Sequence, residues 1–374
     1  MGSIETSAPT CIKCKENAST LQIRSDNICQ SCFCQYVTTK AVKRMETYKT
    51  RGSTKIAKKM LFPLSFGSSS ACLLHILDQH ITSQYKRMNR AAFELHVVHV
   101  DLYLDAVDRK GSAELLEKYK TRFPRHTYSS IGLEEALSLD TIDWSSLGLL
   151  YPPDVESEKP AIERLQHLIA AMPSATSKAD ILTTLLTRLL VSVAKKNDCE
   201  ATIFGDSTTR LAEKTLTETA KGRGFSLPWQ VSDGISTYGV AFNYPLRDLL
   251  KKELVTFSSM ISPPLTKFII RQEPSSHISA SSKQTTIDDL MAQYFESVEE
   301  NFPSIVANVV RTTSKLQPLT WEETNSCGLC GLPVSEGTDG IFGWGGDQNS
   351  DSRVNREHGE QGILCYGCSR SVNG

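Results

Sequence analysis

The sequence lacks three features that would place it in a broad class directly. It has no apolar run approaching the roughly 20 residues that span a bilayer, and residues 1–10 lack the charged-then-apolar pattern of a secretory signal. It also lacks a large net charge, because 41 basic and 42 acidic residues leave a formal charge of -1. These absences predict no membrane span and no global attraction to nucleic acid, so binding of that kind must come from local patches. The expected compartment is the cytoplasm or nucleus.

The composition is otherwise that of an ordinary globular protein. The chain has 374 residues, of which 40% are hydrophobic and 22% are charged. At about 150 residues per domain, this length predicts two or three units, and one of them is large enough for a sizeable core.

Paired cysteines are the most informative feature that is present. Eight of the 11 cysteines form four Cys-x-x-Cys pairs, two near each end of the chain. The remaining three, Cys34, Cys72 and Cys199, are scattered. In an intracellular protein such pairing indicates bound metal rather than disulfides.

The N-terminal pairs have the spacing of a zinc ribbon. The pair Cys11 and Cys14 is separated by 14 residues from the pair Cys29 and Cys32. Each Cys-x-x-Cys pair forms a turn that directs two thiolates at one point, and two such turns predict a tetrahedral zinc site. This site is expected to be structural, because so small a module does not fold without metal. Cys34 is an alternative to Cys32, although Cys32 keeps the two-residue spacing. A cysteine-lined turn without metal is the other interpretation.

The C-terminal pairs, Cys327 with Cys330 and Cys365 with Cys368, are separated by 34 residues rich in Gly, Asp, Asn and Ser. Because the cost of closing a loop rises slowly with its length, this insert permits a second four-cysteine site. We expect a second structural zinc ion there, with an iron–sulfur cluster as the alternative.

Residues 40–59 form the strongest local charge feature, with eight basic residues against a single acid, Glu46. Together with Tyr36 and Tyr48, they predict a surface for a phosphate backbone. The alternative is a solvated helix and linker between two modules. The basic residues are Lys40, Lys43, Arg44, Lys49, Arg51, Lys55, Lys58 and Lys59.

From Met60 onwards the sequence alternates between strand and helix patterns, which predicts an α/β fold with a doubly wound, mostly parallel sheet. Residues 93–101 read as a strand buried on both faces, where His96 and His99 are expected to be core residues. The other expected strands are 60–65, 126–131 and 201–205, and the expected helices are 70–86, 111–123, 157–172, 177–196, 208–221, 245–254, 287–299 and 303–315.

A small-residue loop joins the first strand to the first helix. Such a loop presents backbone N–H groups to an anion, and a nucleotide phosphate is the obvious ligand. The alternative is the tight turn that opens any doubly wound domain. The loop residues are Ser65, Phe66, Gly67, Ser68, Ser69 and Ser70.

The order of these parts resembles the tRNA 2-thiolation proteins of the adenylating PP-loop class, which have a HUP-like core. Active members carry Ser-Gly-Gly-x-Asp-Ser where this chain has residues 65–70, and Gly-His-Asn-x-Asp-Asp where it has residues 205–210. They also carry a Cys-x-x-Cys where this chain has residues 174–180. These departures, with the segments 221–229 and 244–254, resemble the sister family, cytoplasmic tRNA 2-thiolation protein 2.

The departures remove parts that the chemistry needs. Glycine lets a backbone approach a phosphate, whereas Phe66 brings a ring to that place, with a side chain that points away as the alternative. Ser69, Thr209 and Arg210 replace acids. Sulfur relay needs accessible thiolates, but only Cys72 and Cys199 remain in the core. Cys72 is expected to be buried, with a lowered pKa at its helix N-terminus as the alternative.

The resemblance implies a catalytically inactive subunit that does not turn over ATP. It would form a heterodimer with the catalytic thiolase in the cytoplasm and bind tRNA for Lys, Gln and Glu, whose wobble uridine becomes 5-methoxycarbonylmethyl-2-thiouridine. Sulfur would come from a thiocarboxylated ubiquitin-related modifier, which also links the chain to protein urmylation. No membrane is involved.

Further basic residues extend the expected tRNA surface. They are Lys221 and Arg223, with Arg247, Lys251 and Lys252, although salt bridges to Asp248 and Glu253 are the alternative for the last three. The expected units are a ribbon at 1–36, a basic linker at 37–59, the degenerate PP-loop domain at 60–318 and a cysteine module at 319–374. Two other functions stay open: an active ATP-dependent tRNA sulfurtransferase with an unorthodox loop, and a zinc-organised interaction scaffold.

Overall fold

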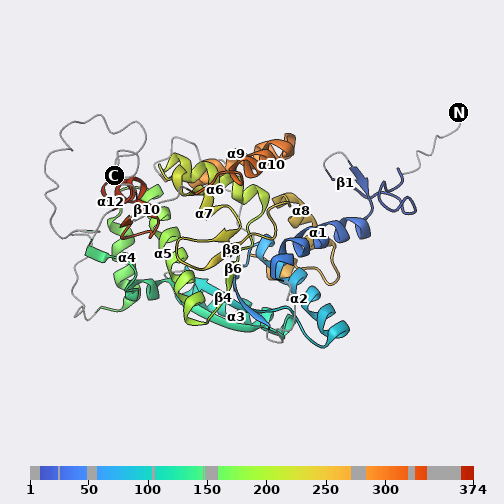
Figure 1. Cartoon of the computed structure of the whole chain (residues 1–374), viewed down its shortest axis with the longest axis horizontal. Coiled ribbons are helices and arrows are strands. Elements are labelled where there is room, and N and C mark those ends of the chain that lie inside the picture. Colours follow the sequence, from blue (N-terminus) through green and yellow to red (C-terminus); the bar gives the residue numbers. More distant parts are fainter. Residues whose placement is uncertain are drawn as a thin grey trace.

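A central sheet organises the computed structural model (Figure 1), which describes residues 9–23, 26–48, 57–102, 106–145, 147, 159–270, 284–318, 325–334 and 364–374. Within these residues the sheet has six strands. From edge to edge they are β5 (Thr127–Gly132), β4 (Phe93–Asp101), β3 (Lys58–Pro63), β6 (Ala201–Ile203), β8 (Ala241–Asn243) and β7 (Gly234–Ile235). Neighbouring strands are parallel, except that β7 runs antiparallel to β8. The predicted doubly wound, mostly parallel α/β fold is confirmed, with its topological switch point between β3 and β6.

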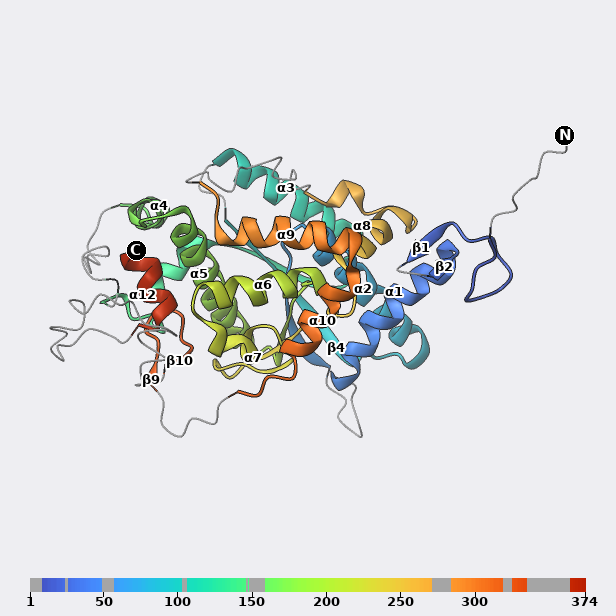
Figure 2. The same ribbon diagram turned by 90° about the horizontal axis from the view of Figure 1, so that it is seen from above.

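Helices cover both faces of this sheet. One face carries α2 (Ser68–Met88), α3 (Ala106–Arg122) and α8 (Lys251–Met260), with α1 (Gln30–Arg44) packed on α2 and α8. The other carries α4 (Ala161–Ala171), α5 (Ala175–Lys196), α6 (Thr208–Ala220), α9 (Ile287–Asn301), α10 (Pro303–Thr313) and α12 (Tyr366–Asn373). Figure 2 shows α6 beside α9 and α10. Short turns complete the fold: η1 (Met45–Tyr48), η2 (Leu133–Ser138), η4 (Gly224–Ser226), α7 (Leu227–Gln230) and η5 (Thr266–Phe268).

The strand β4 shows why its sequence is almost continuously apolar. Phe93, Leu95 and Val97 pack against the layer that contains α2, whereas Val98 and Val100 pack against the layer that contains α5. A strand covered on both faces needs apolar side chains in both directions. His99 is also buried, and its Nδ1 lies 2.8 Å from the carbonyl oxygen of Leu64.

The cysteine-rich segments lie at opposite ends of the molecule (Figure 2). At one end are the hairpin β1 (Leu21–Ile23) with β2 (Asp26–Ile28) and the start of α1; at the other are β9 (Asn325–Ser326), β10 (Pro333–Val334) and α12. Cysteines of both segments belong to the two hydrophobic cores of the sheet. The division at 36/37, 59/60 and 318/319 stays a prediction, and apolar packing crosses it at both ends.

Most expected elements lie within a few residues of their predicted bounds, but the helix predicted at 245–254 begins only at Lys251. Residues 245–250 instead form turns that bury Leu246, Leu249 and Leu250. The helix starts where the carboxylate of Glu253 accepts a hydrogen bond from the backbone N–H of Leu250, at 2.8 Å. No helix among the described residues is long and apolar enough to cross a membrane.

Candidate functional site

The loop between β3 and α2 lies at the switch point of the sheet, where open α/β folds bind ligands. Its Phe66 has a φ of 58°, which is unusual for a bulky residue. The ring is fully buried and stacks on His99 at 4.1 Å and on Tyr119 at 5.5 Å between centroids. The aromatic side chain therefore lies in the core beneath the loop and not in the path of an anion.

Hydrogen bonds within the loop close it on itself. The hydroxyl of Ser70 donates to the carbonyl of Gly67 at 3.1 Å, and the Oγ atoms of Ser65 and Ser70 lie 3.1 Å apart. The loop after β6 packs directly against it, since a Cβ on Gly205 would lie 2.9 Å from the Cα of Ser70. The two loops that resemble the PP-loop motifs thus meet at one place.

Thr209, which replaces an acid in the second loop, is bound into the fold together with its neighbour Thr208, whereas Arg210 is exposed and pairs with Glu213 at 3.0 Å. Thr208 donates to the carbonyl of Arg247 at 2.8 Å. Thr209 donates to Oε2 of Glu299 at 2.5 Å and accepts the N–H of Lys251 at 2.9 Å. The buried Glu299 also accepts the N–H of Lys252 at 2.8 Å, so these groups cap α8.

The core thiols are also enclosed. Cys72 is fully buried and donates to the carbonyl of Leu254 at 3.3 Å, and burial raises the pKa of its thiol. The alternative of a lowered pKa for Cys72 is therefore wrong, because burial outweighs the helix N-terminus. Burial likewise raises the pKa of Cys199 and of Cys34.

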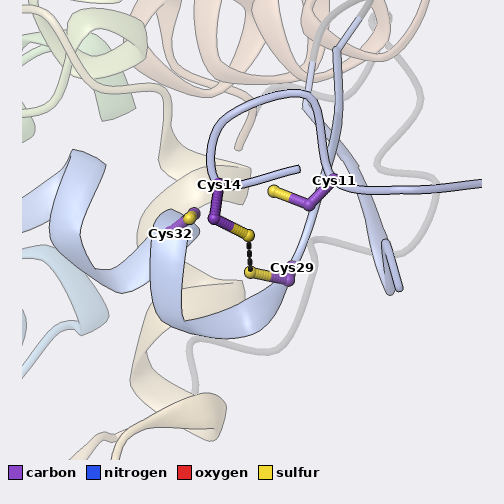
Figure 3. A group of neighbouring side chains, drawn as sticks. All are labelled: Cys11, Cys14, Cys29 and Cys32. Atoms are coloured by element: carbon purple, nitrogen blue, oxygen red, sulfur yellow. Dashed lines mark hydrogen bonds between the residues drawn. The ribbon is translucent and has the colours of Figure 1, made fainter. Parts of the chain in front are cut away.

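Figure 3 shows how the N-terminal cysteines converge. The Sγ atoms of Cys11, Cys14, Cys29 and Cys32 all lie within 4.8 Å of one another, and those of Cys14 and Cys29 are 3.8 Å apart. Cys32, and not Cys34, completes the cluster. The first turn closes at Lys15, whose φ is 58° and whose N–H donates to the carbonyl of Cys11 at 2.9 Å.

The C-terminal cysteines form a similar cluster that is more deeply buried. The Sγ atoms of Cys327, Cys330, Cys365 and Cys368 lie within 4.8 Å of one another, and all four residues are buried. Gly331 closes the first turn with a φ of 71°, where a Cβ would lie 1.9 Å from Nη1 of Arg188. A side chain at this position would therefore strain the backbone and displace the guanidinium of Arg188.

Both clusters fit a single tetrahedral metal ion. With metal–sulfur bonds of about 2.3 Å, the edge of a zinc–thiolate tetrahedron is about 3.8 Å. That is the separation of Cys14 from Cys29 and of Cys330 from Cys365. Four cysteines bound to the separate irons of one cluster would stand farther apart.

The basic surface is divided between exposed and paired residues. Lys43 and Lys59 are exposed. Arg44 pairs with Asp248 at 2.7 Å, Lys58 pairs with Glu200 at 2.5 Å, and Lys40 donates to the carbonyl of Asp248 at 3.4 Å. Part of the predicted patch therefore attaches α1 and β3 to neighbouring elements. Lys49, Arg51 and Lys55 lie outside the described residues.

Three other predicted tRNA contacts point into the protein. Arg223 is 2% exposed and Lys221 is 8% exposed, and both pair with the buried Asp180. Arg247 is also buried and pairs with Asp233 at 3.1 Å. All three side chains are buried and already paired with carboxylates. They therefore do not offer charge to a phosphate at the surface. Lys251 and Lys252 remain exposed.

Sequence reasoning missed two buried acids. Asp180 pairs with Lys221 and Arg223, whereas Glu299 binds Thr209 and the N-terminus of α8. They are 2% and 4% exposed. The sequence did hold a signal for Asp180, which lies beside Ile181 in a helix with apolar neighbouring turns. A carboxylate buried in such a helix needs a buried partner.

Comparison with known proteins identifies the family to which this chain is similar. A family model described as Cytoplasmic tRNA 2-thiolation protein 2 matches residues 286–370. A relative of that name from Sclerotinia sclerotiorum is 64% identical over 299 residues, which cover 80% of each chain. Another, from Phaeosphaeria nodorum, is 49% identical over 368 residues, covering 97% of this chain and 94% of its own.

A solved structure shares the fold. The U34-tRNA thiolase NcsA from Methanococcus maripaludis, determined with its [4Fe-4S] cluster, superposes with a TM-score of 0.56 at 15% identity, over 87% of this chain and 93% of its own. The extent of identity to the fungal relatives, along nearly the whole sequence, shows that the chain belongs to the cytoplasmic tRNA 2-thiolation protein 2 family.

Proposed function

We propose that this chain is the non-catalytic, tRNA-binding subunit of a cytoplasmic tRNA 2-thiolation complex. It would pair with the adenylating thiolase and help to hold tRNA for Lys, Gln and Glu during 2-thiolation of the modified wobble uridine. The sulfur would come from a thiocarboxylated ubiquitin-related modifier. The family's name supports the compartment and the modification, and the fold of a U34-tRNA thiolase supports the descent of the core from an active enzyme.

The main support for an inactive subunit is that the second loop, residues 205–210, has a structural role. Thr209, at a position where active relatives carry an acid, is hydrogen-bonded both to Glu299 and to the N-terminus of α8. An acid at this position can hold a cation that offsets the phosphate charge. Here the position is a threonine, and the neighbouring Glu299 carboxylate is already bonded to Thr209 and to the N–H of Lys252. The enclosed thiol of Cys72 gives independent support.

For tRNA binding we propose a smaller surface than the sequence suggested. Lys43 and Lys59 are its exposed members in the described part of residues 40–59. Lys49, Arg51 and Lys55 stay predicted contacts.

We also propose that each cysteine cluster holds one structural zinc ion. The Sγ separations of 3.8 Å favour one ion over an iron–sulfur cluster at both ends. Elemental analysis of the chain as purified is expected to find two zinc per chain, and iron in place of zinc would contradict the assignment.

Reconstitution tests the function directly. Thiolation of tRNA is measured with this chain alone, with the catalytic thiolase alone and with both, while pyrophosphate release reports adenylation. We expect no pyrophosphate release and no thiolation from this chain alone, and thiolation when both are present. Thiolation by this chain alone would overturn the proposal and favour the active sulfurtransferase. A complex that forms and thiolates without this chain contacting tRNA would favour the scaffold.

A further inference from the structure

Arg223 lies between buried carboxylates and the C-terminal cysteine cluster. Its Nη1 donates to Oδ1 of Asp180 at 2.9 Å and to Oε2 of Glu218 at 3.4 Å, and its Nη2 contacts Oδ2 of Asp180. The same Nη2 lies 3.8 Å from Sγ of Cys368, within hydrogen-bonding range for sulfur. A rigid, planar guanidinium is well suited to join a carboxylate to a thiolate.

The backbone is shaped to permit this contact. Gly367 lies inside the Cys365–Cys368 turn, and a Cβ there would stand 2.7 Å from Cγ and Nε of Arg223. On the opposite side, Gly222 has a φ of 78°, and a Cβ there would stand 2.4 Å from the ring of Tyr366. The metal-binding turn and the segment 221–223 therefore approach each other through two glycines, and the arginine reaches the sulfur because position 367 has no side chain.

Asp180 is held in place by groups from other elements. It accepts a hydrogen bond from Ser371 of α12 at 2.6 Å and pairs with Lys221 at 3.2 Å. Lys221 in turn pairs with Asp288 of α9 at 2.7 Å. The network joins α5, α9 and α12, so the orientation of Arg223 is fixed from three sides.

The chemistry of a four-thiolate site explains the use of a buried cation. A divalent ion with four thiolates carries two excess negative charges, which are costly in a buried place unless they are compensated. An arginine guanidinium is not deprotonated in proteins, and Arg223 is 2% exposed. The side chain is therefore a permanent positive charge beside the cluster.

We propose that Arg223, oriented by Asp180, is a positioning residue for the metal ion at the C-terminal cluster. It fixes the Cys368 thiolate through a charge-assisted hydrogen bond and offsets the excess negative charge of the site. The inference rests on the proposed metal at this cluster and is independent of tRNA binding.

The test compares Arg223→Met with Arg223→Lys in the full chain. Affinity for Zn²⁺ is measured by competition with a chromogenic chelator under reducing conditions. Partner groups of metal ligands typically contribute about 10–100-fold to affinity, so Arg223→Met is expected to weaken one of two Zn²⁺ equivalents by that factor and to leave the other unchanged. Arg223→Lys keeps the charge and is expected to recover part of the loss. Arg109→Met, which breaks a bidentate pair with Glu134, is the matched control and should change neither equivalent.

A second measurement separates positioning from a general loss of stability. In the Co²⁺-loaded chain, the thiolate-to-metal charge-transfer band is expected to shift in Arg223→Met and not in Arg109→Met. The double variant Asp180→Asn with Arg223→Met removes both charges together, and it should bind the second Zn²⁺ as weakly as the single variant. Recovery of wild-type affinity in the double variant would overturn the inference. Wild-type affinity for both Zn²⁺ equivalents in Arg223→Met would overturn it as well. A wild-type chain that binds only one Zn²⁺ would instead contradict the metal at this cluster.

Discussion

Phe66 shows how one residue changes the interpretation of a loop. Its position in the chain suggested a ring obstructing a phosphate, but its left-handed backbone directs the ring into the core against His99 and Tyr119. The loop backbone is held by apolar burial as much as by its own hydrogen bonds. Phosphate binding by this loop therefore depends on the serines and the N–H groups, and not on removing the ring.

Replacing Phe66 by glycine is expected to destabilise the protein. Loss of a buried aromatic ring costs about 3–5 kcal/mol, and relief of the positive φ returns about 1 kcal/mol, so we expect a net loss of about 2–4 kcal/mol in denaturant unfolding. Phe66→Ala is the control: it loses the ring but keeps the strain, and should be about 1 kcal/mol less stable than Phe66→Gly. Wild-type stability in Phe66→Gly would show that the ring contributes little.

A second residue, His75, should make the stability of the protein depend on pH. Burial and the charge of Arg122 lower the pKa of His75 to about 4, although the charge of Asp78 acts in the opposite direction. Because the unfolded state takes up this proton near pH 6.5, stability falls as the pH drops from about 6.5 to 4, by up to about 3 kcal/mol.

His75→Phe removes this titration in a site between Phe123 and Phe257. Urea unfolding between pH 7 and 4 should give a shallower loss of stability for His75→Phe than for wild type. The exposed His167→Gln serves as the control. Parallel profiles for wild type and His75→Phe would contradict the expected contribution.

At the scale of elements, α1 connects the N-terminal cysteine cluster to the sheet. Phe33, Val37 and Ala41 face the protein, and Arg44 at the last turn pairs with Asp248. The basic character of residues 40–59 thus has two uses, attachment and surface charge, which the sequence alone does not separate.

Charge reversal of Lys43 and Lys59 tests the surface use. If both contact phosphates, Lys43→Glu with Lys59→Glu should weaken tRNA binding and reduce the slope of log affinity against log salt by about 2. The paired reversal of Lys118 and Lys315, which are exposed on other elements, is the control. Equal affinity and equal salt dependence in the two double variants would remove Lys43 and Lys59 from the binding surface.

At the scale of the whole molecule, the two cysteine clusters differ in how far they enter the fold. The C-terminal cluster is buried on all four cysteines, whereas Cys14 and Cys32 of the N-terminal cluster are half-buried. Metal at the C-terminal cluster would therefore contribute to the stability of the α/β core itself.

Removing each site by mutation should show this difference. Cys327→Ser with Cys330→Ser is expected to lower the Tm of the main unfolding transition by about 5 °C or more. Cys11→Ser with Cys14→Ser should lower it less, while removing the same amount of metal. Differential scanning calorimetry and metal analysis of the two variants provide the comparison. A larger fall in Tm for the N-terminal variant would contradict the expectation that the C-terminal cluster contributes more to the stability of the α/β core.

How much could be predicted from the sequence follows from the range of the interactions. The fold and the pairing of cysteines rest on local periodicity and spacing, and both are reproduced by the structure. The roles of Lys221 and Arg223 depend on Asp180, 43 residues from Arg223, and a basic residue next to glycines looks the same whether it faces solvent or a carboxylate. The helix predicted from Pro245 failed for a similar reason, since burial of Leu246 and Leu249 outweighed local preference.

The contact between Ser371 and Asp180 also bears on biosynthesis. Its two partners are 191 residues apart, so α5 is synthesised long before α12 can reach it. Until α12 has been made, the side of α5 against which it packs stays uncovered. A truncation that removes α12 would leave that side of α5 permanently open to other chains.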